Sequence, residues 1–430
     1  MKPKNQTYSF QYDVPGRVTT KTGPDGTTSY TYVTSGNGIE QPLTVTGPNS
    51  ISQSYTYDTY GHITQLTESI PGDQDFITGY SYDSWGNNTS VTYPSGISIN
   101  KVYDNGYLSE IKKSDNSSIW KVDKVNGLGQ PVRFTLGSSS LRTNFTYDTY
   151  GNIVHKITGT MEQTDSIDAS TANLSGRYYK DVNSQNGLQE TFSYDDLDRL
   201  THSHISGQPL SHVSYDDDGN ITSKSAVGTY NYMTNKVNTL ENITDNYGSI
   251  STVAQRISYT ASNMTDTITE APYKLQFVYG PGNQRIKTTL KENNEVIKTK
   301  YFSMDYEKEI AGSVTKHFHY IYSPYGLVAV IIKQGTTETL YYAETDRLGS
   351  IIGLINPDGT YAEHYSYDTW GRRRNPTDWS FDNVPTFTLI DRGYTGQEHS
   401  DEFKLINMNG SIPRSKPQNS RYFPKFSETL

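Results

Sequence analysis

The sequence is organised by a short repeat, Tyr-Asp followed by two residues and usually a glycine. Tyr-Asp occurs eight times, beginning at Tyr12, Tyr57, Tyr82, Tyr103, Tyr147, Tyr194, Tyr215 and Tyr367. Several successive copies lie 21 or 25 residues apart, and others lie about twice as far, with a degenerate copy between them. A unit of this length that recurs in series predicts a repeat architecture in which neighbouring units cover one another's apolar faces.

Each unit has the chemistry of a β-hairpin. In "YTYDTYGHITQL", Tyr55 and Tyr57 alternate along a strand and share one face. Asp58 is a favoured first residue of a type I turn, and Gly61 supplies the positive φ that closes the hairpin with a bulge. The motif positions predicted to have this structural role are Tyr57, Asp58, Gly61, Tyr82, Asp83, Gly86, Tyr147, Asp148, Gly151, Tyr194, Asp195, Tyr215, Asp216, Gly219, Tyr367, Asp368 and Gly371.

The composition favours a folded chain whose core is built from tyrosine. Of the 430 residues only 33% are hydrophobic and the mean hydropathy is −0.71, values that would also suit disorder. Aromatic residues make up 12%, however, with 36 tyrosines, and disordered chains are poor in aromatics. Apolar and polar residues alternate with no helical period. The prediction is therefore an all-β fold in which serial hairpins form a long spiralling sheet, with less than about a tenth of the chain in helices.

The overall charge and the absence of cysteines and long apolar runs argue against several classes of protein. The net charge of −9 gives no basic footprint for nucleic acid, and the run Arg372-Arg373-Arg374 is interpreted as a solvated turn. The chain has no cysteine, no apolar run long enough for a membrane span and no signal-peptide core near its N-terminus.

Two longer segments resemble a known family. "YYAETDRLGSIIGLINPDGTYAEHYSYDTWGRRRNP" (Tyr341–Pro376) and "RGYTGQEHSDEFKLINMNG" (Arg392–Gly410) resemble the core region associated with bacterial RHS/YD-repeat proteins. The resemblance implies strands that spiral into a hollow shell, a β-cocoon. Shells of this kind occur in polymorphic-toxin proteins, in the C components of insecticidal toxin complexes and in animal teneurins. The matching core positions are Asp346, Leu348, Gly349, Ser350, Asp358 and Gly359.

The resemblance divides the chain into YD/RHS repeats at 1–300, a core-like region at 301–410 and an atypical tail at 411–430. The tail, "SIPRSKPQNSRYFPKFSETL", departs from the family pattern and is expected to be disordered. It lacks the family's cleavage region and leaves no room for a toxin domain. A frameshift or premature end is the leading explanation.

No catalytic, cofactor or metal site is predicted. Asp216–Asn220 lacks the ligand spacing of a calcium loop, and the pairs His202/His204 and His317/His319 lack a third ligand. Asp346 and Asp358 are interpreted as structural.

The leading functional hypothesis is a non-catalytic shell of a secreted or cell-surface bacterial protein, which would encapsulate and deliver a C-terminal toxin. The resemblance leaves two alternatives open, a carbohydrate-binding adhesion module and an aspartyl-type autoprotease. The expected partners are a toxin cargo or delivery component, or cell-surface carbohydrate. Nucleic acid is not an expected partner.

Overall fold

The computed structural model describes residues 7–137, 141–182, 186–234, 238, 240–245 and 253–407. Its larger sheet is a 22-stranded antiparallel meander in which each strand pairs with the next along the chain. These strands are β1 (Ser9–Tyr12), β2 (Val18–Gly23), β3 (Gly26–Tyr32), β4 (Pro42–Thr46), β5 (Ser52–Tyr57), β6 (Ile63–Ser69), β7 (Phe76–Tyr82), β8 (Asn88–Thr92), β9 (Ser98–Asp104), β10 (Tyr107–Lys113), β11 (Ser118–Val125), β12 (Pro131–Leu136), β13 (Arg142–Tyr147), β14 (Ile153–Thr158), β15 (Met161–Ile167), β16 (Leu174–Asp181), β17 (Leu188–Tyr194), β18 (Leu200–Ile205), β19 (Ser211–Tyr215), β20 (Ile221–Lys224), β21 (Gly228–Tyr232) and β22 (Leu240–Asp245).

A second, 11-stranded antiparallel sheet follows. Its strands are β23 (Arg256–Tyr259), β24 (Thr265–Glu270), β25 (Tyr273–Tyr279), β26 (Arg285–Glu292), β27 (Glu295–Ser303), β28 (Tyr306–Ala311), β29 (Val314–Ser323), β30 (Gly326–Gln334), β31 (Thr337–Thr345), β32 (Ile351–Ile355) and β33 (Tyr361–His364). The chain continues through two small ladders, β34 (Ser366–Tyr367) with β35 (Arg373–Arg374) and β36 (Glu398–Ser400) with β37 (Leu405–Asn407). The helices of the described residues are single 3₁₀ turns at Pro48–Ser50, Tyr394–Gly396 and Asp401–Phe403.

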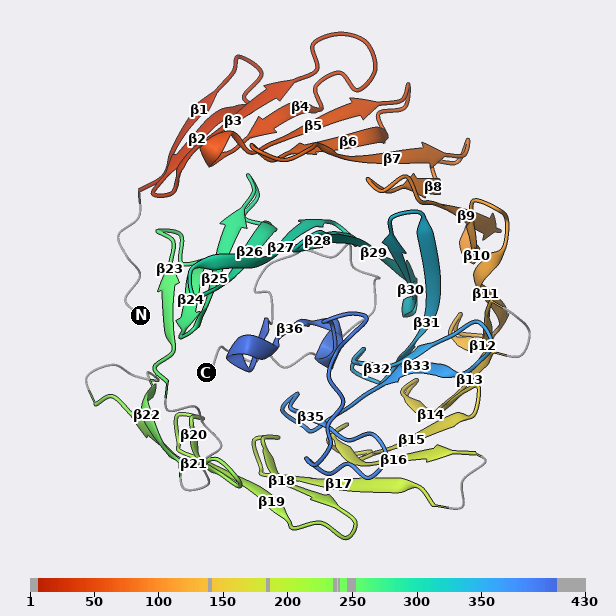
Figure 1. The fold of residues 1–430 in the computed structure, drawn as a ribbon. Helices are drawn as coiled ribbons and strands as arrows, with labels where there is room; N and C mark the ends of the chain where they lie inside the picture. Colours follow the sequence, from red (N-terminus) through yellow and green to blue (C-terminus); the bar gives the residue numbers. More distant parts are fainter. Residues whose placement is uncertain are drawn as a thin grey trace.

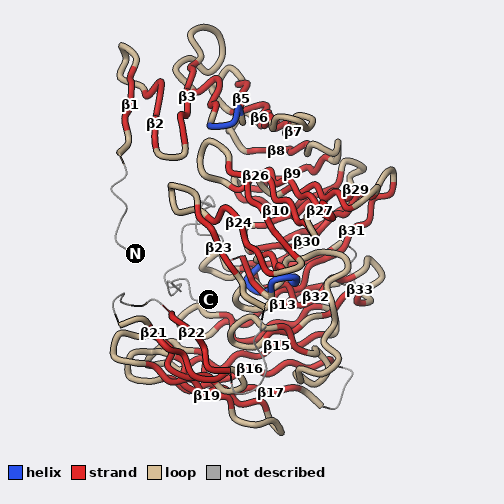
Figure 2. Tube along the Cα trace, turned by 60° about the vertical axis from the view of Figure 1, so that its left-hand side comes forward, coloured by secondary structure: helices blue, strands red, loops and turns tan. Residues whose placement is uncertain are grey.

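The chain winds inward as a spiral. The first sheet traces the outer arc and the second returns inside it, with β36 further in (Figure 1). In the view turned by 60°, strands of the second sheet lie between the two ends of that arc (Figure 2). The two layers share one core, in which Phe76 packs on Tyr301 and Tyr306 and Ser95 hydrogen-bonds His319. That core also includes Ile99, Ile111, Trp120, Leu136, Ile286, Ile321, Val328 and Ile331.

The predicted fold class is confirmed, because serial hairpins build a long spiralling sheet in an all-β chain. Residue 300, where the predicted repeat region meets the core-like region, lies inside β27, and the two sheets divide between β22 and β23. The tail at 411–430 lies outside the described residues.

Candidate functional site

The repeat turns share one hydrogen-bond pattern. Asp58 Oδ1 accepts the backbone N–H groups of Tyr60 (2.8 Å) and His62 (2.9 Å), and Gly61 has a φ of +85°. A register shift between Thr56 and Tyr57 marks the bulge. Aspartate oxygens accept equivalent bonds at Asp83, Asp148, Asp195, Asp216 and Asp368. Positive φ values recur at Gly86, Gly151, Gly219 and Gly371, and at Asp198 in the glycine position.

The repeat tyrosines connect neighbouring units. The Tyr82 hydroxyl donates to the carbonyl of Ile63 (2.9 Å), and Ile63 is the cross-strand partner of Tyr57, the preceding repeat tyrosine. Tyr215 follows the same rule, because its hydroxyl donates to Leu200, the partner of Tyr194. The other repeat tyrosines donate their hydroxyls to backbone carbonyls in the same way: Tyr57 to Pro42, Tyr147 to Pro131, Tyr194 to Leu174 and Tyr367 to Ile351. Each ring is thus buried or half-buried and its hydroxyl has a hydrogen-bond partner. These bonds connect each hairpin to the hairpin that precedes it in the chain.

The core positions that match the RHS/YD-repeat pattern also form turns. Asp346 Oδ1 accepts the N–H groups of Leu348 (2.9 Å) and Ser350 (2.8 Å), and Gly349 has a φ of +81°. Burial raises the pKa of Asp346. The buried Ser350 hydroxyl accepts the N–H of Thr395 (3.0 Å), which joins this turn to the C-terminal segment.

Asp358 and Gly359 lie in the next turn along the chain. Asp358 Oδ1 accepts the N–H (2.9 Å) and the hydroxyl (2.6 Å) of Thr360. Gly359 has a φ of +90° and donates to the carbonyl of Asn356.

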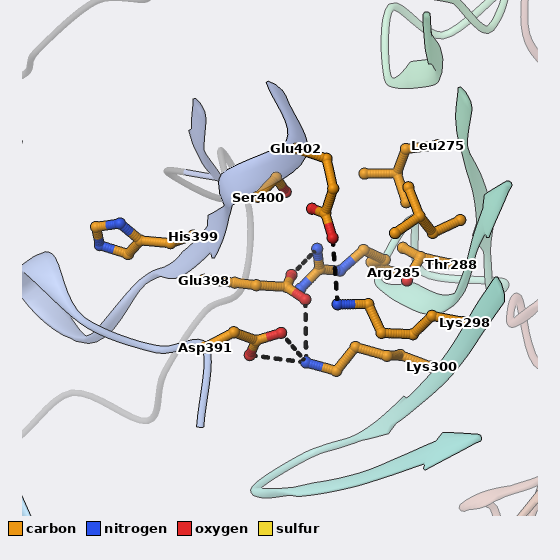
Figure 3. A pocket seen from close by; sticks show the side chains of 11 residues that line it. Leu275, Arg285, Thr288, Lys298, Lys300, Asp391, Glu398, His399, Ser400 and Glu402 are labelled. Carbon is orange, nitrogen blue, oxygen red and sulfur yellow. Dashed lines mark hydrogen bonds and ion pairs between the residues drawn. The ribbon is translucent and has the colours of Figure 1, made fainter. Parts of the chain in front are cut away.

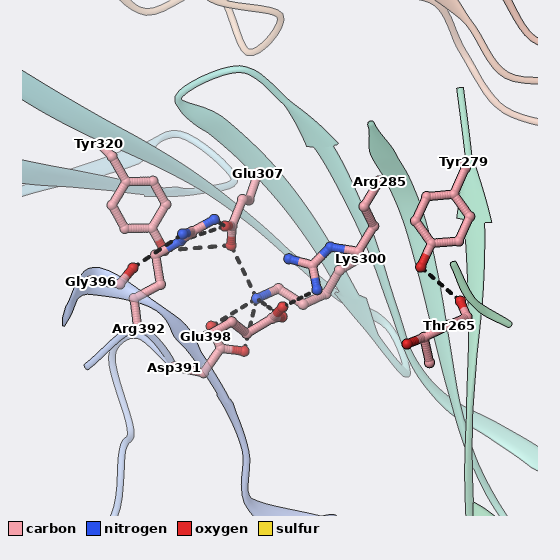
Figure 4. A network of polar contacts seen from close by, with 10 residues as sticks. All are labelled: Thr265, Tyr279, Arg285, Lys300, Glu307, Tyr320, Asp391, Arg392, Gly396 and Glu398. Atoms are coloured by element: carbon pink, nitrogen blue, oxygen red, sulfur yellow. Dashed lines mark hydrogen bonds and ion pairs between the residues drawn. The ribbon is translucent and has the colours of Figure 1, made fainter. Parts of the chain in front are cut away.

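The C-terminal segment is held to the second sheet by buried charges that we call the ion-pair clasp (Figures 3 and 4). Lys300 on β27 lies 2.8 Å from both carboxylate oxygens of Asp391, 3.0 Å from Glu307 and 3.2 Å from Glu398. Two arginines complete the clasp. Arg285 pairs with Glu398 at 2.5 Å, and Arg392 pairs with Glu307.

The clasp balances three cations against three carboxylates in a largely buried environment. The Lys300 side chain is 3% exposed and that of Glu307 is 1% exposed. Burial raises the pKa of Asp391 to about 6, with Lys300 opposing the rise. The pKa of Glu398 is held below its usual range, because Arg285 and Lys300 outweigh its burial. Such a network binds segments together only while every partner is present, since a lone buried charge is costly.

A second buried cluster ties the C-terminal segment to the outer sheet. Arg177 on β16 pairs with Glu190 on β17 at 2.6 Å and donates to the carbonyl of Tyr367 (2.9 Å). Arg374 lies 3.0 Å from the same Glu190 carboxylate and stacks 4.1 Å from the Trp379 ring.

The prediction that the three arginines at 372–374 form a solvated turn is therefore wrong for Arg374, which is 1% exposed. Arg372 is exposed and stacks on Phe381, whereas the half-buried Arg373 stacks on Phe387. No local pattern distinguishes the third arginine, which meets the buried Glu190 from a distant strand.

The geometry of the clasp suits attachment better than catalysis. The cavity beside it, lined by Lys300, Asp391 and Glu398 among others, has a volume of about 20 Å³, room for about one water. Its acids and bases are bonded to one another. Within the described ranges no group of three or more His, Cys, Asp or Glu side chains could hold a metal ion. His317 and His319 instead bond to Tyr306, Ser95 and the carbonyl of Ile331.

Sequence reasoning missed the clasp entirely. Arg285, Lys300 and Glu307 follow the ordinary alternation of β-strands, so they cannot be distinguished from solvent-facing charges without the packed C-terminal segment. In the part of the chain that is described, no helix is long and apolar enough to cross a membrane.

Neither a protein-family model nor a curated protein sequence matches the chain. Solved structures match in fold. A crystal structure of TcdB2-TccC3 without the hypervariable C-terminal region has a TM-score of 0.57 at 13% identity, over 93% of this chain and 25% of that one. A crystal structure of TcdB2-TccC3 has a TM-score of 0.54 at 12% identity, and the Photorhabdus luminescens Tc holotoxin pore has 0.52 at 12%, each over 93% of this chain and 26% of that one.

This chain therefore has the fold of part of a Tc toxin-complex chain. It spans about a quarter of the length of the structures it matches.

Proposed function

We propose that this chain is a non-catalytic wall segment of an RHS-type shell that encloses a polypeptide attached at its C-terminal side. The observation that carries the proposal is the inward course of the chain. β36 lies inside the spiral (Figure 1), where the clasp and the Arg177–Glu190–Arg374 cluster hold the C-terminal segment. Polypeptide that follows Asn407 would therefore start on the inner side of the wall.

The likeness to toxin-complex chains supports the same function. One matched structure is described as lacking a hypervariable C-terminal region, and another is named TcdB2-TccC3-Cdc42. A shell that encloses an exchangeable C-terminal polypeptide, which we call the passenger, fits both descriptions. We propose by extension that the protein acts outside the cell or at its surface, with a toxin or a delivery component as its partner.

Protection of an appended peptide tests the proposal. A peptide that carries a site for a specific protease is attached after Leu430 in one version of the chain and before Met1 in another. The C-terminal site is expected to be cut more slowly than the N-terminal site, and Lys300→Met is expected to remove the difference because it weakens the clasp. Equal cleavage of both sites in the unaltered chain would contradict the enclosure.

A further inference from the structure

Three of the nine histidines of the chain gather on one face of the neighbouring strands β18 and β19. The strand register sets His202 directly opposite His212, and the centroids of their rings lie 4.7 Å apart. His204 follows two residues later on β18, so its side chain projects from the same face. The sequence shows only the pair on β18, and it is the pairing of the two strands that brings His212 to it.

This histidine face lies on the outside of the spiral. β18 and β19 belong to the outer arc (Figure 1). Val213, which follows His212, is buried, and so is Phe192, whose cross-strand partner Ser203 separates the two histidines of β18. Because side chains on a strand alternate between its two faces, the histidines point away from these buried residues. His204 and His212 are accordingly exposed to solvent.

Hydrogen bonds fix which nitrogen of His202 carries the hydrogen. The Thr201 hydroxyl donates its only hydrogen to the carbonyl of Ser193 (3.1 Å), so its oxygen accepts a bond from His202 Nδ1, 3.0 Å away. Nε2 of the neutral ring therefore keeps a lone pair. Histidines that bind a metal through one nitrogen commonly donate the other N–H to an oxygen in this way.

His212 has a similar arrangement at a longer distance. Its Nδ1 lies 3.5 Å from the hydroxyl of Ser214. Among the described residues, the Nε2 atoms of His202 and His212 have no hydrogen-bond partner. The six histidines outside this face differ, because each contacts a protein group: His62 contacts Asp58, His155 Glu162, His317 Tyr306, His319 Ser95, His364 Tyr361 and His399 the N–H of Tyr394.

Short hydroxyl side chains surround the pair. Ser193 lies opposite His202 on β17, Thr191 lies opposite His204, and Ser214 lies opposite Ser223 on β20. Within these described rows no lysine or arginine side chain stands beside the rings to repel a cation. Side chains of this size also leave room above the rings for an ion and its water ligands.

We propose that His202 and His212 bind one divalent transition-metal ion through their Nε2 atoms. Imidazole nitrogen suits Zn²⁺, Ni²⁺ and Cu²⁺, whereas Mg²⁺ and Ca²⁺ prefer oxygen ligands. Because no three His, Cys, Asp or Glu side chains of the described residues could hold an ion together, the protein supplies two ligands. Water or a group from another molecule completes the coordination, unlike the closed four-ligand shell of a structural zinc site.

This inference stands apart from the enclosure of a passenger. Glu190, which pairs with Arg374 of the C-terminal segment, lies on the face of the outer sheet that carries Phe192. The histidines occupy the opposite face, so a metal ion bound there does not contact the groups that hold that segment.

Isothermal titration calorimetry of the full chain without an affinity tag tests the proposal. The probe is Zn²⁺, and Mg²⁺ in the same buffer is the control. One Zn²⁺ ion is expected to bind per chain, and Mg²⁺ is expected not to bind. No binding of Zn²⁺, or equal binding of the two ions, overturns the proposal.

Variants locate the ion on the chain. His202→Asn and His212→Asn are each expected to weaken Zn²⁺ binding more than about tenfold, because either change leaves a single imidazole of the pair. His204→Asn is the matched control, because His204 is an exposed histidine of the same strand and face whose partner on β17 is Thr191. Circular dichroism confirms that each variant is folded.

A second control addresses a competing pair. His155 lies 2.9 Å from Glu162 on β14 and β15, and His155→Asn is expected to leave Zn²⁺ binding unchanged. An equal loss in His204→Asn or in His155→Asn, or none in His202→Asn and His212→Asn, refutes the assignment.

Discussion

Replacement of Lys300 by methionine tests the clasp most directly. Methionine keeps most of the aliphatic length of lysine and removes the charge that three carboxylates share. Glu307 keeps Arg392 and Glu398 keeps Arg285, but Asp391 loses both of its 2.8 Å bonds to the ammonium group. Because breaking a buried pair from one side leaves an uncompensated charge, the variant should lose about 3–5 kcal/mol of stability at pH 8.

The pH dependence of this loss identifies its cause. The pKa of Asp391 is already raised to about 6, above its ordinary value of 3.8, so the folded state binds the extra proton between these values. Asp391 therefore opposes folding increasingly as the pH rises through this window. Without Lys300 its pKa rises further, and the difference between the variant and the parent chain should grow from pH 5 to pH 8.

Two comparisons complete the experiment. Lys298→Met removes a neighbouring lysine on the same strand whose partner Glu402 lies 3.9 Å away, and this partly exposed pair should contribute less than about 1 kcal/mol. Adding Asp391→Asn to Lys300→Met should restore part of the loss, since no charge is then stranded. Denaturant melts measure the stabilities, and hydrogen exchange localises the change to residues 387–407. A pH-independent loss, or no rescue by Asp391→Asn, would refute the reasoning.

Three further predictions concern the repeat and the chemistry. In denaturant melts, Gly61→Val should lower the free energy of unfolding by more than about 1 kcal/mol, and Gly61→Asn by clearly less. A Cβ at this position meets no atom within 4 Å, so only the φ of +85° disfavours a side chain there. Equal losses in the two variants would contradict the assigned turn. Tyr147→Phe should cost about 0.5–1.5 kcal/mol by leaving the Pro131 carbonyl without its 2.7 Å bond, whereas Tyr150→Phe should cost nothing measurable. The purified chain should keep its intact mass on prolonged incubation, and a discrete fragment absent from a denatured control would favour the autoprotease alternative.

The fold was predictable because its determinants are local. Asp58 and Gly61 specify a turn within a few residues, and the alternation of Tyr55 and Tyr57 specifies the face of the strand. Repetition of the unit then predicts a meander. The inward return of the second sheet was not predictable in the same way, since contacts such as Phe76 on Tyr301 join residues far apart in the sequence.

The buried charges could not be predicted from the sequence either, because they too depend on contacts between residues far apart in the chain. Lys300 and Arg374 look like solvated residues until a distant segment covers them, and burial alone turns each into a fixed partner of a carboxylate. The matching core positions indicated part of this arrangement, because the turn at Asp346 places Ser350 where its hydroxyl contacts Thr395. The motif therefore marked the place where the C-terminal segment docks, but not the charges that hold it there.

The inner and outer sides of the spiral differ in the side chains that they carry. Its inner side concentrates charge that is paired and buried, which fixes the path of the C-terminal segment and lets it respond to pH through Asp391. Its outer side over β1–β9 carries mainly serine and threonine side chains, and Tyr60 and Trp85 are exposed at one rim. Thr56 lies on β5 of the first sheet and Lys300 lies on β27 of the second, so Thr56→Glu leaves the clasp intact whereas Lys300→Met removes one of its charges. Loss of passenger protection in Lys300→Met but not in Thr56→Glu would therefore assign the protection to the clasp.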